Sequence, residues 1–240
     1  MKLAAVSTVW NEADIIGATL THLYSEGVAN VYIADGMSTD GTRDVLAQFP
    51  CKVYDDTEDC HRQPYWMNRL VLQASEDGAD WVICFDADEF WYAPSGRTLA
   101  ETFDDIDATI IGKVYAKMWQ HLDYELREPQ PKTLPKVAVH AGAGITIANG
   151  NHEAVVPGGA LHDMLAIREI QFRGFEHFCR KIRARCERLD PALPPGEGTH
   201  MTQFKGWTDE QLAPIWQSFV DRATVHDPIP LRVAQCTPRS

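Results

Sequence analysis

The stretch WVICFDADEFW, residues 81–91, joins a hydrophobic run directly to a cluster of negative charge. Segment 81–85 is entirely apolar, and Asp86, Asp88 and Glu89 follow it at once. A short continuous apolar run is typical of a strand that is covered on both faces of a parallel sheet. Open parallel sheets bind their ligands beyond the carboxyl ends of the strands. We therefore expect Asp86 and Asp88 to face a ligand crevice at the end of a buried strand.

Strand-like and helix-like segments alternate through the first part of the chain, which indicates βαβ units. The expected strands are 3–9, 28–33, 51–54 and 81–85, and the expected helices are 15–27, 42–49 and 64–76. This order predicts an α/β fold with a mostly parallel central sheet flanked by helices. Asn11, Glu12 and Asp35 also follow strand ends, so they are expected to meet Asp86 and Asp88 in one crevice.

The second half of the sequence is less regular. It predicts a strand at 114–118, a hairpin over 137–147 and a helix from Phe175 to Leu189 that prolines end. No internal repeat or linker divides the chain, so we expect a single domain over residues 1–240. Its halves would be 1–120, which binds the nucleotide, and 121–240, an irregular part on the acceptor side.

Composition narrows the classes of protein and of partner. The formal net charge of −12 makes broad nucleic-acid binding unfavourable. No apolar run reaches the roughly 20 residues of a membrane-spanning helix. The beginning MKLAAV lacks the long apolar core of a signal peptide. The six cysteines show no disulfide framework, so we expect reduced thiols and a cytoplasmic protein.

The D-x-D arrangement of Asp86 and Asp88 suits a hard divalent cation. Mg²⁺ and Mn²⁺ bind carboxylate oxygens and share their other positions with water and substrate phosphate. Such a cation would also offset the repulsion between neighbouring carboxylates. The alternative is a solvated acidic turn after a buried strand.

A basic ridge lies near the C-terminal third of the sequence. Arg173, His177, Lys181 and Arg185 recur every four residues, which places them along one side of a helix. Arg and Lys there would hold a diphosphate well. The alternative is an ordinary solvated helix face.

Five stretches together resemble glycosyltransferase family 2, in its family-2-like branch, which has the GT-A fold. They keep the order and separations of that family over roughly residues 3–200. The stretches are V-x-x-x-x-N-E (Val6 to Glu12), A-D-G-M-S-T-D-G-T (Ala34 to Thr42), D-W-V-I-C-F-D-A-D-E-F (Asp80 to Phe90), G-N-H-E (Gly150 to Glu153) and F-R-G-F-E-H-F-x-x-K (Phe172 to Lys181).

The resemblance implies an enzyme that transfers a sugar from a nucleotide-sugar donor, a UDP- or GDP-sugar, to an acceptor that the sequence does not identify. It also implies a role for each matching residue. The nucleoside would be contacted by Asn11, Glu12 and Asp35, and Asp40 would support their loop. Asp86 would lie near the ribose and the metal, and Asp88 would be the main ligand of Mn²⁺ or Mg²⁺. The leaving diphosphate would be neutralised by Arg173 and Lys181.

Four residues before Arg173, relatives in the family carry His, and here the sequence departs from them. Glu169 stands there and is expected to be a third metal ligand. An inverting transferase also needs a general base. Family position favours Glu153, with His152 as the alternative base or as a metal or donor contact. The His152–Glu153 pair could instead brace a turn, and Asp123 and Asp163 stay open as bases.

Two other functions remain open. One is a nucleotidyltransferase of similar fold, and the other is a non-catalytic module that binds nucleotide-sugars. Aromatic faces suit sugar rings, so an acceptor pocket is expected to involve the following side chains, each of which could equally belong to the core: Trp91, Tyr92, Trp119 and His121.

Overall fold

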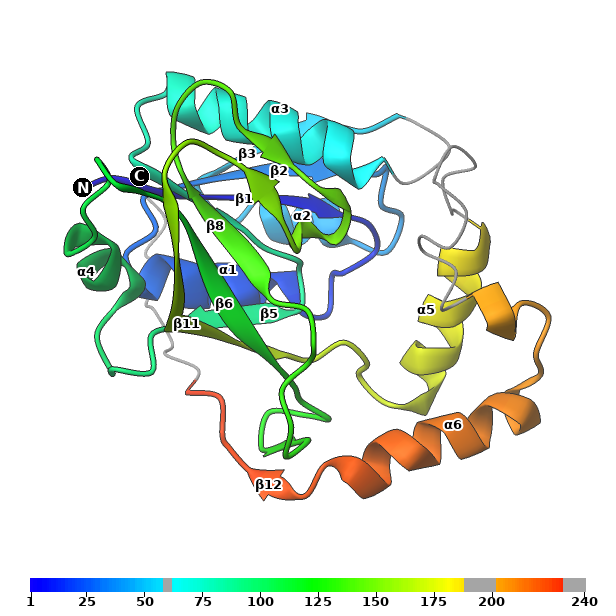
Figure 1. The fold of residues 1–240 in the computed structure, drawn as a ribbon. Helices are drawn as coiled ribbons and strands as arrows, with labels where there is room; N and C mark the ends of the chain where they lie inside the picture. The colour runs from blue at the N-terminus through cyan, green and yellow to red at the C-terminus, as the bar shows by residue number, and fades with distance from the viewer. Residues whose placement is uncertain (58–61, 188–201, 231–240) are drawn as a thin grey trace.

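A computed structural model describes residues 1–57, 62–187 and 202–230 (Figure 1). The α-helices are α1 (Ile16–Ser25), α2 (Thr42–Leu46), α3 (Gln63–Glu76), α4 (Leu99–Asp104), α5 (Phe175–Glu187) and α6 (Asp209–Arg222). The strands are β1 (Leu3–Val9), β2 (Asn30–Asp35), β3 (Cys51–Asp55), β4 (Trp81–Cys84), β5 (Glu89–Tyr92), β6 (Ile111–Gln120), β7 (Leu126–Arg127), β8 (Lys136–His140), β9 (Thr146–Ile147), β10 (Ala154–Val155), β11 (Gly159–Glu169) and β12 (Val225–His226). Short 3₁₀ turns are η1 (Asn149–Asn151) and η2 (Thr202–Phe204).

The main sheet has eight strands in the order β3-β2-β1-β4-β8-β6-β11-β5. β3, β2, β1 and β4 run parallel, as the alternating pattern predicts. β8 is antiparallel to both β4 and β6, and β5 is antiparallel to β11. Val6 of β1 lies opposite Cys84, the last residue of β4, and β1 runs on in the same direction to Val9. The loops that follow them therefore share one edge of the sheet.

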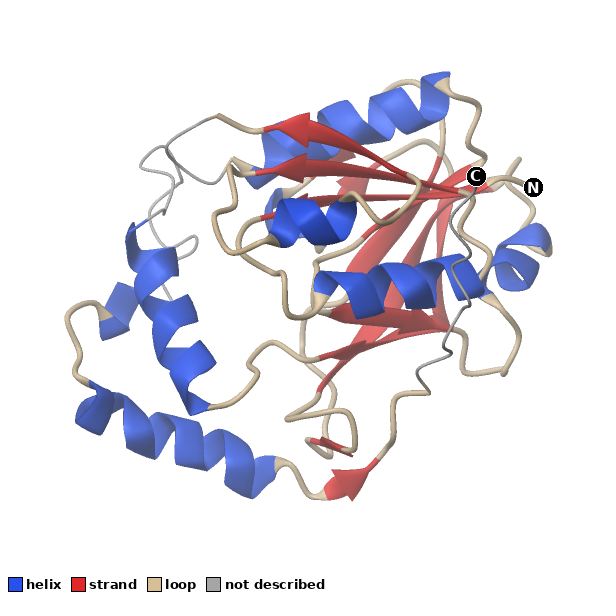
Figure 2. Ribbon diagram, turned by 180° about the vertical axis from the view of Figure 1, so that it is seen from behind, coloured by secondary structure: helices blue, strands red, loops and turns tan. Residues whose placement is uncertain are grey.

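Each face of the sheet is covered by a separate group of elements, which explains why β4 is apolar throughout. α1, α2 and α4 pack on one face around residues such as Ile16, Leu46 and Phe103 (Figure 2). α3 and the β9–β10 pair cover the other face, where Met67 and Leu70 meet Val82. The four residues of β4 are all buried, and Asp86 begins to emerge beyond them.

α5 and α6 lie together at the side of the sheet toward which β1 and β2 point (Figures 1 and 2). They share a small apolar cluster in which Phe178 packs near Trp216 and Phe219. No α-helix among the described residues combines the length and hydrophobicity of a membrane span. Cys51, Cys84 and Cys179 are free thiols.

Several elements of the second half differ from the sequence prediction. The predicted hairpin over 137–147 is wrong, because β8 enters the main sheet between β4 and β6 whereas β9 pairs with β10. The long strand β11 and helix α6 were not predicted at all. α2 ends at Leu46, three residues before the predicted end. The predicted end of the α5 helix at Leu189 lies outside the described residues.

Candidate active site

A cavity of about 810 Å³ opens at the shared end of β1 and β4. Its walls come from residues 8–12, from the loop after β4, from the segment around Lys132 and Lys136, from η1 and His152, and from one side of α5. This is the strand-end crevice that the sequence predicts. Of the predicted site residues, those that line it are Asn11, Glu12, Asp86, Asp88, His152, Glu169 and Lys181.

Asp88 and Lys181 form a buried ion pair across the cavity. Nζ of Lys181 lies 2.5 Å from Oδ2 of Asp88 and 3.3 Å from Oε1 of Glu12. Burial alone would raise the pKa of Asp88, but the charge and hydrogen bond of Lys181, followed by Arg173 and Arg185, lower it instead. Asp88 is therefore a carboxylate at neutral pH. The helix that the sequence predicts as a diphosphate binder also supplies the counterion of the D-x-D motif.

Asp86 is held by three side chains from distant parts of the chain. Its Oδ1 accepts from Nε2 of Gln63 at 3.2 Å and from Nδ2 of Asn151 at 3.3 Å, while its Oδ2 lies 2.5 Å from Nζ of Lys136. Lys136 also lies 3.1 Å from Oε1 of the fully buried Glu89. Lysines thus offset the negative charge that follows β4: Lys136 neutralises Asp86 and Lys181 neutralises Asp88.

Glu89 lies behind the cavity wall. Its Oε2 accepts from the backbone N–H of Asp86 at 3.0 Å and from Nε1 of Trp91 at 3.1 Å. Burial raises the pKa of Glu89 to about 8, even though Lys136 acts in the opposite direction. Glu89 thus holds the backbone of the D-x-D turn rather than facing a ligand.

The three predicted metal ligands, Asp86, Asp88 and Glu169, all line the cavity, and their oxygen atoms are the donors that Mn²⁺ and Mg²⁺ prefer. Each is engaged by a lysine, which for Glu169 is Lys132. These carboxylate oxygens fit a divalent cation, provided that the cation replaces the ammonium groups of the lysines.

Three other side chains also bring possible metal-ligand atoms together. Among the described residues, the potential ligand atoms found within 4.8 Å of one another belong to Glu12, Asp14 and His177. Arg173 already forms ion pairs with the carboxylates of Glu12 and Asp14. Its Nη2 lies 2.5 Å from Oε2 of Glu12, and its Nε lies 2.7 Å from Oδ2 of Asp14. That trio is therefore better described as an arginine-binding site of the protein itself.

Arg173 consequently does not line the cavity, contrary to its expected contact with the diphosphate. Its guanidinium ties the start of α5 to the loop after β1, and its backbone N–H donates to Nδ1 of His177 at 3.2 Å. That hydrogen bond requires a neutral His177. Burial, with Arg173 and Lys181 nearby, lowers the pKa of His177 to about 3.

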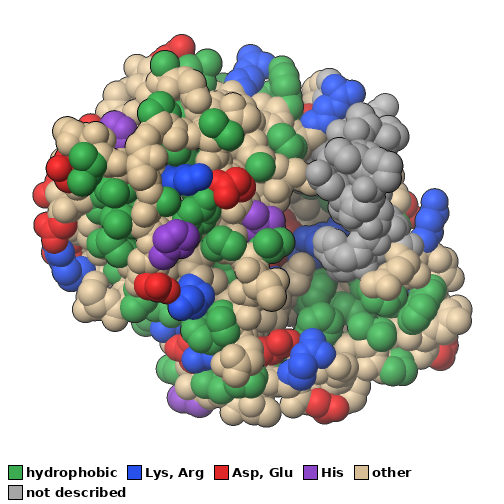
Figure 3. Space-filling model, in the orientation of Figure 1, with side chains coloured by type: hydrophobic (Ala, Val, Ile, Leu, Met, Phe, Trp, Pro, Cys, Tyr) green, Lys and Arg blue, Asp and Glu red, His purple; other side chains and the backbone are tan. Residues whose placement is uncertain are grey.

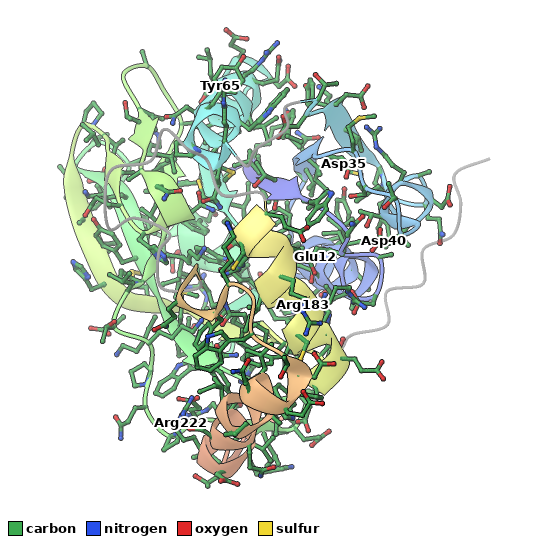
Figure 4. The ribbon with its side chains drawn as sticks, turned by 90° about the vertical axis from the view of Figure 1, so that its right-hand side faces the viewer. Glu12, Asp35, Asp40, Tyr65, Arg183 and Arg222 are labelled. Carbon is green, nitrogen blue, oxygen red and sulfur yellow. The ribbon has the colours of Figure 1, made fainter. Side chains whose placement is uncertain are left out.

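Asp35 and Asp40 brace the nucleoside-side loops instead of lining the cavity. The buried Asp35 accepts from Oγ of Ser38 at 2.5 Å and from Nε of Arg43 at 2.6 Å. Asp40 accepts from the backbone N–H of Ala13 at 3.1 Å, so it supports the loop that carries Glu12. Figure 4 shows Glu12 beside α5, with Asp35 and Asp40 toward β2 and α2.

His152 lines the cavity, and one of its ring nitrogens is held by the backbone. Its Nδ1 lies 2.7 Å from the carbonyl oxygen of Pro135, which assigns the proton to Nδ1 and leaves Nε2 as an acceptor. Burial and the nearby Lys136 lower the pKa of His152. Gly150 makes room for the ring: it has φ +75°, and a Cβ there would lie 2.6 Å from Cδ2 of His152.

Glu153 points elsewhere, which does not match the expectation that it faces the substrate. It does not line the cavity, and its Oε1 lies 2.5 Å from both Nζ of Lys113 and the hydroxyl of Tyr115. Burial opposes its ionisation, but these donors outweigh burial and lower the pKa of Glu153 to about 2. The open alternatives Asp123 and Asp163 are also outside the cavity lining.

The expected aromatic acceptor pocket is wrong. Trp91 is fully buried in the core, and His121 is only 1% exposed. Tyr92 and Trp119 lie beneath Arg168 and Arg127, with 3.9 and 4.0 Å between guanidinium carbon and ring centre. None of the four lines the cavity.

Sequence reasoning missed Lys132, Lys136 and Gln63. The two lysines stand in the segment KTLPK, which carries no recognised motif and reads as a Pro-rich loop. A usable signal was the excess of carboxylates after β4, since buried carboxylates require cations nearby. The face shown in Figure 3 carries Lys and Arg side chains scattered among Asp and Glu rather than gathered in one patch.

The strand-end cavity, the D-x-D turn and the basic helix facing it define an α/β protein of the GT-A type. The sequence profile described as "Glycosyl transferase family 2" matches residues 5–150, more than half of the chain. The protein therefore belongs to glycosyl transferase family 2, as the motifs predicted.

Individual relatives are distant. A glycosyltransferase family 92 protein from Ricinus communis is 28% identical over 102 residues, which cover 40% of this chain and 17% of that protein. S. aureus TarS shows 15% identity and a TM-score of 0.48, with 84% of this chain and 42% of TarS covered. Mannosyl-3-phosphoglycerate synthase from Rubrobacter xylanophilus shows 14% identity and a TM-score of 0.49, with 82% and 78% covered.

Proposed function

We propose that the protein is a metal-dependent, inverting glycosyltransferase that moves a sugar from a UDP- or GDP-sugar to an acceptor hydroxyl. The observation that carries this proposal is the pairing of Asp88 with Lys181 across the cavity at the end of β4. It brings a carboxylate suited to a divalent cation next to an ammonium suited to a diphosphate. Family membership supports the same reaction class.

The donor would lie along the sheet edge. Asn11 and Glu12 stand on the nucleoside side, and the loop that carries them is fixed by Asp40 and by the hydrogen bond from the N–H of Asn11 to Oγ of Ser38 at 2.8 Å. We assign Asp35 an indirect role, since it is buried and engaged by Ser38 and Arg43. It would shape this loop for the nucleoside.

Asp88, Asp86 and Glu169 would hold Mn²⁺ or Mg²⁺. The bound cation would act as a Lewis acid that stabilises negative charge on the diphosphate. Lys181 would donate from the opposite wall to the oxygens on which charge builds as the sugar leaves. Gln63 and Asn151 would keep the Asp86 carboxylate oriented, because both donate to its Oδ1.

His152 is the general base in this proposal. His152 lines the cavity and its Nε2 is left as an acceptor, whereas the carboxylate of Glu153 is bound by Lys113 and Tyr115 outside the lining. Nε2 would take the proton of the acceptor hydroxyl while its oxygen bonds to the anomeric carbon from the side opposite the diphosphate. The bond from that carbon to the diphosphate breaks at the same time, so the anomeric configuration is inverted. The hydrogen bond from Nδ1 to Pro135 would keep the ring in the required tautomer.

The test is release of nucleoside diphosphate. The protein is incubated with Mn²⁺ and, one at a time, with UDP- and GDP-sugars, with EDTA replacing Mn²⁺ in a parallel series. We expect metal-dependent release with one nucleotide class, and NMR of the product should show the inverted anomer. Release of pyrophosphate from a nucleoside triphosphate and a sugar phosphate would instead identify a nucleotidyltransferase. Binding without any release would identify a binding module.

A further inference from the structure

Two arginines of the cavity wall form no ion pair with a carboxylate among the described residues. Arg180 and Arg185 both line the cavity from α5 and both are exposed. Within ranges 1–57, 62–187 and 202–230, neither makes an ion pair. The other cationic side chains of the lining are each paired with a lining carboxylate: Lys132 with Glu169, Lys136 with Asp86, and Lys181 with Asp88.

The helix places the two arginines on either side of a small residue. At 3.6 residues per turn, five positions turn the helix by about 140°, so Arg180 and Arg185 stand at the two edges of the cavity-facing side, with Lys181 and Ala184 between them, and are roughly 7.5 Å apart along the axis. Ala184 itself lines the cavity with only a methyl group. The two long side chains can therefore reach over Ala184 toward one anionic group. Guanidinium groups bind phosphate and carboxylate oxygens in pairs, which a lysine cannot do.

The charge of the cavity leaves room for an anion beyond the donor. Within the part of the chain that the structure describes, the lining contains five cationic side chains and four carboxylates. A divalent cation and a doubly charged diphosphate would cancel one another, so positive charge would still be left over. An acceptor that carries an oxyanion would match this remaining charge, whereas a neutral acceptor would not.

We propose that Arg180 and Arg185 form an anion site for a phosphate or carboxylate group carried by the acceptor. This inference rests on the proposed transferase function and specifies its acceptor class: a hydroxyl compound that bears an oxyanion. The same chemistry could arise from the donor's own diphosphate, and the experiment separates these two sources.

The experiment measures binding of inorganic phosphate by calorimetry to protein already saturated with Mn²⁺ and its nucleoside diphosphate. We expect phosphate to bind this complex, and Arg180→Met with Arg185→Met to weaken that binding at least about tenfold, since hydrogen bonds between charged groups are among the stronger ones. The affinity for the nucleoside diphosphate should change little, which also shows that the variant is folded.

Arg183→Met is the matched control. Arg183 lies on the same helix (Figure 4) but pairs with Asp209 outside the cavity lining. Phosphate that binds only nucleotide-free protein, or arginine variants that lose nucleoside diphosphate affinity instead, would assign the pair to the donor and overturn the inference. Failure of the wild type to bind any nucleoside diphosphate would contradict the proposed function itself, a result distinct from both.

Discussion

Lys181 and Asp88 lie 2.5 Å apart although 93 residues separate them in the chain. Asp88 follows the central strand β4, and Lys181 stands in the middle of α5. In the proposed function the pair joins a carboxylate that would bind the metal and a cation that would bind the diphosphate of the same substrate. Without substrate these groups neutralise each other, so any divalent cation has to compete with an ammonium for Asp88.

This competition gives the first prediction. Lys181→Met should bind Mn²⁺ about tenfold more tightly than wild type in the absence of nucleotide, an effect of about 1.4 kcal/mol. Turnover should fall, because the variant lacks the cation that faces the leaving diphosphate. Calorimetric titration with Mn²⁺ measures the first effect and steady-state kinetics the second. Lys52→Met, which removes an exposed lysine paired with Asp77, serves as the control and should change neither. Weaker Mn²⁺ binding by Lys181→Met would show that Lys181 does not compete.

The second prediction compares the two candidate bases. His152→Gln should lower turnover by about 10²–10⁴, the usual contribution of a general base. Glu153→Gln should stay close to wild type, since its carboxylate contacts Lys113 and Tyr115 rather than the cavity. Donor affinity should change little in either variant, because the base acts in the transition state. If Glu153→Gln instead shows the large loss, the family position predicts the base better than the geometry does.

A third prediction concerns Gly150, beneath the ring of His152. Gly150→Ala introduces both backbone strain at φ +75° and a methyl group 2.6 Å from the imidazole. Gly144→Ala is matched to it, since Gly144 has φ +78° and nothing within 4 Å of an added Cβ. Strain alone should destabilise each by about 1 kcal/mol, measured by urea unfolding. Only Gly150→Ala should also reduce turnover; equal activities would mean that the ring position is unimportant.

The fourth prediction is the pH dependence of stability that His121 confers. Burial, outweighing Asp227, lowers the pKa of His121 to about 4. Between that value and the unfolded value near 6.5, the unfolded chain binds a proton that the native state does not, so stability falls as the pH falls. From pH 6 to pH 5, wild type should lose about 1 kcal/mol more than His121→Leu. Parallel losses in urea unfolding would show that His121 titrates normally in the folded protein.

The elements within residues 3–85 could be predicted because local sequence decides them, whereas β5 and α4 were not predicted. Apolar runs such as that of β4 and the helical stripe of α3 each carry their own periodicity. The sheet register then follows from the short connections between neighbouring elements. β8 and β11 could not be predicted in the same way. β8 inserts between β4 and β6, so its place depends on segments distant in the chain rather than on its own pattern.

The candidate site could likewise be predicted only in part. Asp86, Asp88 and Lys181 stand in motifs and were found, together with the cavity edge on which they lie. Arg173 and Glu153 also stand in motifs, but their partners, Asp14 and Lys113, turn them away from the cavity lining. Lys136 stands in no motif, and only the folded structure brings it to Asp86. A motif identifies a residue type and a place in the chain, whereas the direction of a side chain depends on its partners.

The separation between Asp88 and Lys181 also has a consequence during protein synthesis. At typical rates of translation, Lys181 is added roughly 5–20 s after Asp88. During that interval β4 can already pair with β1, but Asp88 lacks its counterion. Burying an unpaired carboxylate is strongly unfavourable. The free energy of the emerging chain is therefore lower while this end of the sheet stays open and Asp88 stays hydrated. Closure of the cavity would then be one of the last steps of folding, after the ribosome has released α5.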